Sequence, residues 1–431
     1  MENIGKYEIV KELGSGATST VYLATDPFGE KQVALKLFKE EVMRDVSTGA
    51  AFRKLLRNEA SLAGKLVHPH IVHVKDAVME GDRNYMVMEY VEGETLEKYA
   101  EVDHLLPINT VAEIAYKCCK ALEYAQSQGV IHRDIKPANI LFTGGSDIKI
   151  SDFGAAMIEN HEGTQISGVG SPAYMSPEQI KEQQLTHQTD IYSLGVTMYK
   201  LLTGKLPFDA TNNFSMIYQI MNLEPQPPSA WRPEIPSDLD AIVLHAMQKE
   251  PNGRYRTWQD FADELVHFFS SEAPASKQIF DTEKFSVLRE LQFFKRFSDV
   301  ELWEVLHFSE WRKVPKEEVI IKEGDDGNAF FIIASGTVKV LKGGRLLNLL
   351  HKGDCFGEMM VLEESEAKRT TDITAKTDVT LIEVKPEVLE KASNGCRFKF
   401  SDTFLRILVK RLAVANTRIS HLLAADDIVQ Q

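Results

Sequence analysis

The segment from Val130 to Leu141 constrains the fold of this 431-residue chain more than any other feature of its sequence. It reads Val-Ile-His-Arg-Asp-Ile-Lys-Pro-Ala-Asn-Ile-Leu, so polar and charged side chains stand between two apolar runs. Asp134 is able to accept a hydrogen bond from a substrate hydroxyl, Lys136 to neutralise a transferring γ-phosphoryl group, and Asn139 to ligate a metal ion. The segment therefore predicts a loop that supports phosphoryl transfer.

A second motif, Asp-Phe-Gly over 152–154, follows a strand expected over 148–150. That strand would deliver the carboxylate of Asp152 to the same cleft as Asn139. Two oxygen ligands beside available phosphates favour Mg²⁺ over zinc, which prefers several histidine or thiol ligands, because these motifs contain one histidine and no cysteine. We therefore predict that Asn139 and Asp152 bind Mg²⁺.

Two glycines, Gly14 and Gly16, lie among strand-like runs over 7–37. Their spacing lets a hairpin backbone close over phosphates without interference from Cβ atoms. An ordinary strand turn is the alternative interpretation, because glycine pairs are common in such turns.

Lys36 lies within an apolar strand over 33–37, where an unpaired ammonium group would carry a desolvation penalty. Its partner would be Glu59, on a helix expected over 52–66, together with the α- and β-phosphates of ATP. The alternative is a lysine whose ammonium group reaches the surface.

Composition excludes several classes of protein. The formal net charge of -14 disfavours a general nucleic-acid binder. Four cysteines in so long a chain favour a reducing compartment over a disulfide framework. The N-terminus has no apolar signal core, and no stretch approaches the roughly 18 apolar residues of a membrane span. We therefore expect a cytoplasmic protein.

The order of predicted elements indicates an α+β chain of two domains, because strands over 7–37 are followed by helices over 111–127, 190–203 and 239–247. A small, polar run over 271–278 predicts a linker. Beyond it, strand-like runs appear over 319–322, 329–341, 345–350 and 372–384, with a hairpin turn at Gly343-Gly344. We expect domains over 1–270 and 284–431, joined by a linker over 271–283.

The first domain resembles protein kinases of the bacterial serine/threonine branch, over roughly residues 7–270. The matching motifs occur in the family's order: the glycine loop, Lys36, Glu59, His132-Arg133-Asp134, Asp152-Phe153-Gly154, Ser176-Pro177-Glu178, Asp190 and Arg254. The family pattern has a third glycine where Ser19 stands and an alanine where Ser176 stands. Both replacements are small, so we expect neither to abolish activity.

This resemblance implies two lobes, 1–91 and 92–270, that hold ATP and Mg²⁺ between them and phosphorylate Ser or Thr hydroxyls of protein substrates. The catalytic residues it implies are Lys36, Glu59, Asp134, Lys136, Asn139 and Asp152. The ATP-binding residues it implies are Leu13, Gly14, Gly16, Val21, Ala34, Lys36, the gatekeeper Met88, Glu89, Val91 and Leu141. Glu178 and Arg254 would form a buried structural ion pair.

Arg133, beside Asp134, suggests control by phosphorylation of the activation loop, since a guanidinium group can pair bidentately with phosphate. Thr164 and Ser167 are the candidate acceptors. The alternative is that they are ordinary polar loop residues.

In the second domain, Gly357 opens a short predicted helix whose N–H groups suit a phosphate, and Arg369 could neutralise its charge. Glu358 could bind a ribose hydroxyl. The alternative is that these residues form a routine surface arrangement that binds no ligand.

The segment over 284–425 also resembles a cyclic-nucleotide-binding domain, a jelly-roll β-barrel with flanking helices. This resemblance implies contacts from Glu358 to the 2′-hydroxyl and from Arg369 to the cyclic phosphate of cyclic AMP or cyclic GMP, with Thr370 contacting phosphate or base.

The segment departs from the family's pattern in Met360, in the absence of a proline before Arg369, and in a longer run between Glu358 and Arg369. A degenerate barrel that only docks partners is therefore the alternative.

A last helix is expected to carry a seam with coiled-coil spacing, formed by Leu405, Leu408, Leu412, Ala415, Ile419 and Leu422. This seam predicts a homodimer; the alternative is a stripe that packs on its own barrel.

We expect a serine/threonine kinase regulated by cyclic nucleotide, with no nucleic acid as partner. Two alternatives remain: a pseudokinase scaffold, and a constitutive kinase whose barrel serves for localisation. The presence of Lys36, Asp134, Asn139 and Asp152 argues against the pseudokinase.

Overall fold

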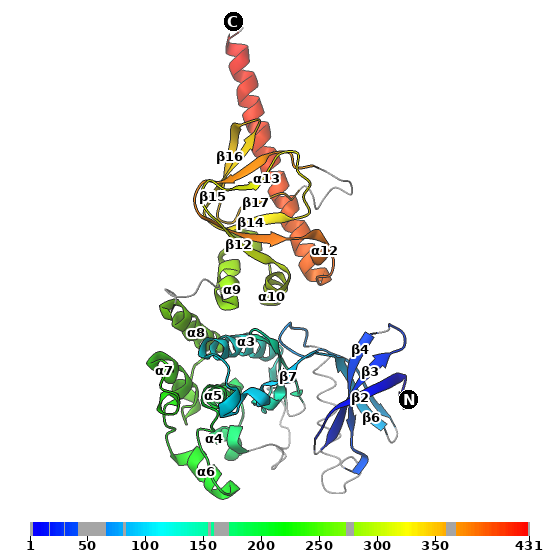
Figure 1. Cartoon of the computed structure of the whole chain (residues 1–431), viewed down its shortest axis with the longest axis vertical. Coiled ribbons are helices and arrows are strands. Elements are labelled where there is room, and N and C mark those ends of the chain that lie inside the picture. Colours follow the sequence, from blue (N-terminus) through cyan, green and yellow to red (C-terminus); the bar gives the residue numbers. More distant parts are fainter. Residues whose placement is uncertain are drawn as a thin grey trace. The chain divides into compact units, whose positions relative to one another are not determined.

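The computed structural model describes residues 3–16, 18–29, 31–41, 66–80, 83–153, 157–158, 172–272, 280–358 and 368–429. Glu59, Thr164 and Ser167 lie outside these ranges, as does most of the helix expected over 52–66. The chain divides into two compact units, Met1–Gln278 and Ile279–Gln431 (Figure 1). 

A six-stranded antiparallel sheet forms the N-terminal lobe of the first unit, in the strand order β1-β2-β3-β4-β6-β5. Its strands are β1 (Asn3–Ile4), β2 (Tyr7–Ser15), β3 (Ser19–Asp26), β4 (Lys31–Phe38), β5 (Val74–Glu80) and β6 (Arg83–Glu89). Val33 and Leu35 of β4 pack with Tyr7 and Val87 in the core of one sheet face. Because side chains alternate along a strand, Ala34 lies on the opposite face.

The C-terminal lobe of this unit is mainly helical. Its α-helices are α3 (Ile108–Ser127), α4 (Pro177–Ile180), α5 (His187–Thr203), α6 (Asn213–Asn222), α7 (Ser237–Ala246) and α8 (Trp258–Glu272). Its 3₁₀ helices are η1 (Leu96–Tyr99), η2 (Val102–His104), η3 (Pro137–Asn139), η5 (Pro172–Tyr174), η6 (Pro228–Ala230) and η7 (Pro251–Gly253). Helices α3 and α5 pack on each other, α3 also on α8, and α5 also on α7.

Short strands of the C-terminal lobe carry or precede the residues predicted for catalysis. Strands β10 (Asp147–Ile150), β9 (Ile140–Gly144) and β7 (Glu94–Thr95) form a sheet in that order, and β8 (Val130–Ile131) pairs with β11 (Met157–Ile158). The loop between β8 and β9 contains Asp134 and Asn139, and β10 leads to Asp152. Three helices lie where the sequence predicts them, and the predicted α+β class is confirmed.

The second unit begins with α9 (Asp281–Glu290), η8 (Gln292–Phe294) and α10 (Asp299–Phe308). Two four-stranded sheets follow, ordered β12-β19-β14-β17 and β13-β18-β15-β16. Their strands are β12 (Glu310–Val314), β13 (Val319–Ile321), β14 (Phe330–Ser335), β15 (Thr337–Lys342), β16 (Arg345–His351), β17 (Cys355–Phe356), β18 (Asp372–Ala375) and β19 (Val379–Val384). Buried apolar residues from both sheets, including Ile333, Val338 and Leu381, form one core, as expected for a jelly roll.

Two runs that the sequence predicts as single strands are each two strands. The run over 329–341 divides at Gly336, between β14 and β15. Gly336 has a positive φ of 90°, and a Cβ atom there would collide with the carbonyl oxygen of Asp378. The run over 372–384 divides into β18 and β19. The predicted turn at Gly343-Gly344 is present, with positive φ at both glycines.

The chain then forms α12 (Pro386–Leu389) and the long helix α13 (Asn394–Val429). The start of α13 packs through aromatic rings, such as Phe404 against Phe330 at a centroid distance of 5.0 Å. Figure 1 shows α13 continuing past β16 toward the C-terminus. Of the predicted seam, Leu405 and Leu412 are each 62% exposed. No helix within the described residues is sufficiently long and apolar to cross a membrane.

Candidate functional site

The loop after β8 is held by one buried carboxylate, Asp190 of α5. Its two oxygens accept hydrogen bonds from the N–H groups of His132 and Arg133, both at 2.7 Å. Arg133 adopts a positive φ of 72°, which places two successive amides on one carboxylate. Burial raises the pKa of Asp190 above its usual range, although these amides and His132 act in the opposite direction.

Asp134 is oriented by two side chains of the same loop, Lys136 and Asn139. Its Oδ2 accepts hydrogen bonds from Lys136 Nζ at 2.7 Å and from Asn139 Nδ2 at 2.9 Å. Asn139 Nδ2 also donates to the carbonyl oxygen of Asp134 at 2.8 Å. Three residues predicted for catalysis are therefore brought together by short local contacts, and the amide nitrogen of Asn139 is turned toward Asp134.

Asp152 follows β10 and lies beside Lys36 of β4, with which it forms an ion pair through Oδ1. It has a positive φ of 62°. Burial acts to raise the pKa of Asp152, but Lys36, together with His132 and Lys136, holds that pKa below its usual value. Phe153 is buried against His132 at a ring centroid distance of 4.5 Å. The carboxylate after β10 and the lysine of β4, 116 residues apart, thus meet in one cleft.

The residues predicted to bind ATP come from the strands that line this cleft. Leu13 and Gly14 belong to β2, Val21 to β3, Ala34 and Lys36 to β4, Met88 and Glu89 to β6, and Leu141 to β9; Gly16 and Val91 lie just beyond β2 and β6. Met88 also lines a pocket together with Leu66, Ile71, Val72, Val74, Asp152 and Phe153. The carboxylate of Glu89 accepts bonds from His73 N and Lys149 Nζ, both at 2.8 Å, so it joins β6 to β10.

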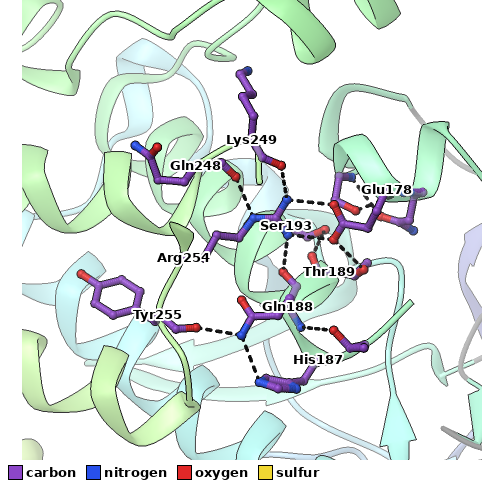
Figure 2. Close-up of polar contacts among 12 residues, drawn as sticks. Glu178, His187, Gln188, Thr189, Ser193, Gln248, Lys249, Arg254 and Tyr255 are labelled. Atoms are coloured by element: carbon purple, nitrogen blue, oxygen red, sulfur yellow. Dashed lines mark hydrogen bonds and ion pairs between the residues drawn. The ribbon is translucent and has the colours of Figure 1, made fainter. Parts of the chain in front are cut away.

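The expected ion pair of Glu178 and Arg254 is present and buried (Figure 2). Its two hydrogen bonds measure 2.7 and 2.8 Å, and Thr189 donates a third to Glu178 at 2.9 Å. Burial acts to raise the pKa of Glu178, but Arg254 holds it below the usual value. Ser176, which replaces an alanine of the family pattern, forms a capping box with Gln179 at the start of α4.

In the second unit, Arg369 lies against the backbone at the end of β17. Its Nη2 donates to the carbonyl oxygen of Ala329 at 2.6 Å. A Cβ atom added at Gly357 would lie 2.6 Å from Nη1, and one added at Gly327 would collide with the guanidinium group. Burial lowers the pKa of Arg369. Glycines at 327 and 357 therefore leave room for the buried guanidinium group of Arg369 against the backbone.

Glu358, predicted to contact a ribose, is buried and forms an ion pair with Arg411 of α13. Arg411 also donates to the carbonyl oxygen of Cys355. Sequence reasoning missed Arg411, because no motif or periodicity marks an arginine 53 residues after its partner. Thr370, by contrast, is exposed. Glu358 and Arg369 flank Gly357, so the structure brings three of the four predicted residues together.

These features define a two-lobed phosphotransferase fold followed by a β-barrel in which a buried arginine lies against the backbone. The protein kinase domain family matches residues 7–267, more than half of the chain, and the cyclic nucleotide-binding domain family matches residues 311–394. The chain belongs to the protein kinase family and carries a cyclic nucleotide-binding domain after its kinase domain.

Similar proteins include the serine/threonine-protein kinase PknB of Mycobacterium tuberculosis, 36% identical over 292 residues that cover 66% of this chain and 46% of that protein. A probable serine/threonine-protein kinase of Streptomyces coelicolor is 40% identical over 270 residues, or 61% of this chain and 39% of that protein. The chain therefore matches less than half the length of these relatives.

Proposed function

We propose that this chain is a serine/threonine protein kinase that transfers the γ-phosphoryl group of ATP to protein hydroxyls. The proposal is carried by two groups of contacts, the pair of Lys36 with Asp152 and the bonds of Asp134 to Lys136 and Asn139. The residue before Asp152, Ser151, donates its N–H to the carbonyl oxygen of Asn139 at 2.9 Å, so the two groups are neighbours. The names of the similar bacterial kinases support the choice of serine and threonine. The protein substrates would be other proteins of the cytoplasm.

In this proposal each residue has a distinct role. Asp134 accepts the proton of the attacking hydroxyl, because its carboxylate is oriented by Lys136 and Asn139. Lys136 neutralises charge on the transferring phosphoryl group, and Lys36 binds the α- and β-phosphates. Glu59, the partner expected for Lys36 in that state, lies outside the described residues.

The donor set fits Mg²⁺. The amide nitrogen of Asn139 donates to Asp134, so the amide oxygen of Asn139 points away from Asp134. Asp152 supplies a carboxylate held ionised by Lys36. Two hard oxygen ligands completed by phosphates and water suit Mg²⁺, whose chemistry would be to neutralise the charge of the triphosphate.

The variant Asp152→Asn tests this assignment. It keeps the shape of the side chain and removes the charge that binds metal, so we expect phosphate transfer to fall by at least about a hundredfold. Transfer is measured with radiolabelled ATP and a general protein substrate. Undiminished transfer by this variant would reject the kinase proposal, whereas ATP binding without any transfer by the wild type would favour the pseudokinase.

We also propose that cyclic AMP or cyclic GMP binds the barrel and shifts the kinase between two states. Support for an anionic ligand comes from Arg369, a buried cation whose guanidinium group donates to the carbonyl oxygens of Ala329 and Gly357. Such a ligand acts only through different affinities for the two states. Calorimetry that detects no heat and no thermal stabilisation with either nucleotide would favour the docking-only barrel.

Phosphorylation of Thr164 or Ser167 forms the last part of the proposal. Both residues lie outside the described ranges, and Arg133 is their proposed partner. Mass spectrometry of the active enzyme should find phosphate between residues 155 and 175. Fully active protein without such phosphate would contradict this part alone.

A further inference from the structure

The hairpin between β2 and β3 ends opposite Lys39, the residue that follows β4. In the β3–β4 ladder, Ser19 pairs with Phe38 and Val21 with Lys36, so position 39 faces the loop tip that precedes Ser19. The tip closes through a bond from Gly16 N–H to the carbonyl oxygen of Ser19 at 2.8 Å. The register of the sheet therefore places residue 39 beside the glycine-rich loop.

Lys39 contacts this tip through its main chain and its side chain. Its N–H donates to the carbonyl oxygen of Thr18 at 2.9 Å. Its Nζ donates to the carbonyl oxygen of Gly16 at 2.6 Å. The first bond is open to almost any residue, whereas the second requires a long cationic side chain. A hydrogen bond from a charged donor is also stronger than one between neutral groups.

We propose that Lys39 is a positioning residue for the phosphates of ATP, because it fixes the loop tip against the strand that carries Lys36. By holding the Gly16 carbonyl oxygen, Lys39 fixes the position of the loop at Gly16. It also adds positive charge to a loop that must approach a triphosphate.

This inference rests on the proposed kinase function and adds a residue that no sequence motif marks. Lys36 and Lys39 are three positions apart, one in β4 and one just after it. The two parts of the chain assigned to the phosphates, the loop and Lys36, thus keep a fixed spacing. The residues that the kinase resemblance assigns to the adenine base, Val21, Ala34 and Leu141, take no part in this bond.

The test compares Lys39→Met, Lys39→Arg and the control Lys11→Met in the full chain. Lys11 is an exposed lysine of β2 in the same sheet. Calorimetry measures the Kd for ATP with Mg²⁺ and, separately, for adenosine. We expect Lys39→Met to weaken ATP binding roughly three- to tenfold and to leave adenosine binding unchanged, since one partly exposed charged hydrogen bond is lost. Lys39→Arg should recover most of the loss, and Lys11→Met should match the wild type.

The outcomes separate the inference from the function on which it rests. Unchanged ATP affinity in Lys39→Met, or equal losses for ATP and adenosine, would overturn the role of Lys39 alone. Wild-type protein that fails to bind ATP would overturn the proposed function as well. In steady-state assays the same variant should raise KM for ATP more than it lowers kcat.

Discussion

At the scale of single residues, two buried charges of the first unit, Asp190 and Arg254, each have more than one partner. Asp190 binds two successive amides of the catalytic loop. Arg254 binds Glu178 and also the carbonyl oxygens of Gln188, Gln248 and Lys249 (Figure 2). Such pairs are costly to break one partner at a time, because the remaining charge stays buried. Their role is to hold loops near the cleft in one arrangement.

Replacing Arg254 by methionine should destabilise the kinase unit by about 3–5 kcal/mol, because Glu178 would remain buried without its partner. The double variant Glu178→Leu with Arg254→Met should cost clearly less, since no charge is then stranded. Urea unfolding followed by tryptophan fluorescence measures both. Equal losses in the single and double variants would show that the pair contributes through packing alone.

The same pair predicts a pH dependence. The folded-state pKa of Glu178 lies below its ordinary value of 4.5. Its contribution to stability is therefore complete above that value and is lost as the pH falls through the lower folded-state pKa. As the pH falls from 5 through the folded-state pKa of Glu178, the wild type should lose more stability than Glu178→Gln, because the glutamine side chain has no proton to bind. Parallel acid profiles would contradict this assignment.

At the scale of elements, the sequence predicted what is encoded locally. Asp134, Lys136 and Asn139 lie within six positions, and their mutual bonds follow from one short loop. The division of the barrel strands at Gly336 was missed, because an apolar run of strand-forming residues hides a break that only packing against Asp378 requires. The bond from Lys39 to Gly16 was missed for the related reason that it depends on strand register.

Helix α13 also reaches the candidate ligand site, through Arg411. This residue neutralises the buried Glu358 beside the place predicted for an anionic cyclic phosphate. We expect Arg411→Ala to weaken binding of cyclic AMP or cyclic GMP about three- to tenfold, because Glu358 would then repel the ligand. Arg411→Lys should recover part of the loss, since an ammonium group lacks the fork that bonds both Glu358 and Cys355.

Isothermal calorimetry measures this effect, with Arg406→Ala as the matched control. Arg406 is an exposed arginine of the same helix and pairs with Asp402 at 2.9 Å. Hydrogen exchange provides a second readout: Arg411→Ala should increase exchange over 355–358 even without ligand. Tighter nucleotide binding by Arg411→Ala would show instead that Arg411 competes with the ligand for Glu358.

At the scale of the whole molecule, α13 is the element through which two chains are predicted to associate. Leu405 and Leu412 are each 62% exposed, which argues against the alternative that this part of the seam packs on its own barrel. Two exposed leucines one heptad apart suit a partner helix of the same sequence. We expect wild type to have twice the chain mass by light scattering at micromolar concentration, and Leu405→Asp with Leu412→Asp to have the mass of one chain.

Lys410→Asp is the control, because Lys410 is exposed on α13 away from the leucine stripe, and this variant should keep the dimer mass. If the wild type had the mass of one chain, the predicted homodimer would be wrong. Since Arg411 of the same helix binds Glu358, dimerisation and ligand binding should be coupled. Linkage then requires cyclic nucleotide to change the dimer dissociation constant by the same factor by which dimerisation changes nucleotide affinity. A dimer constant that is identical with and without bound nucleotide would show that α13 does not connect the two events.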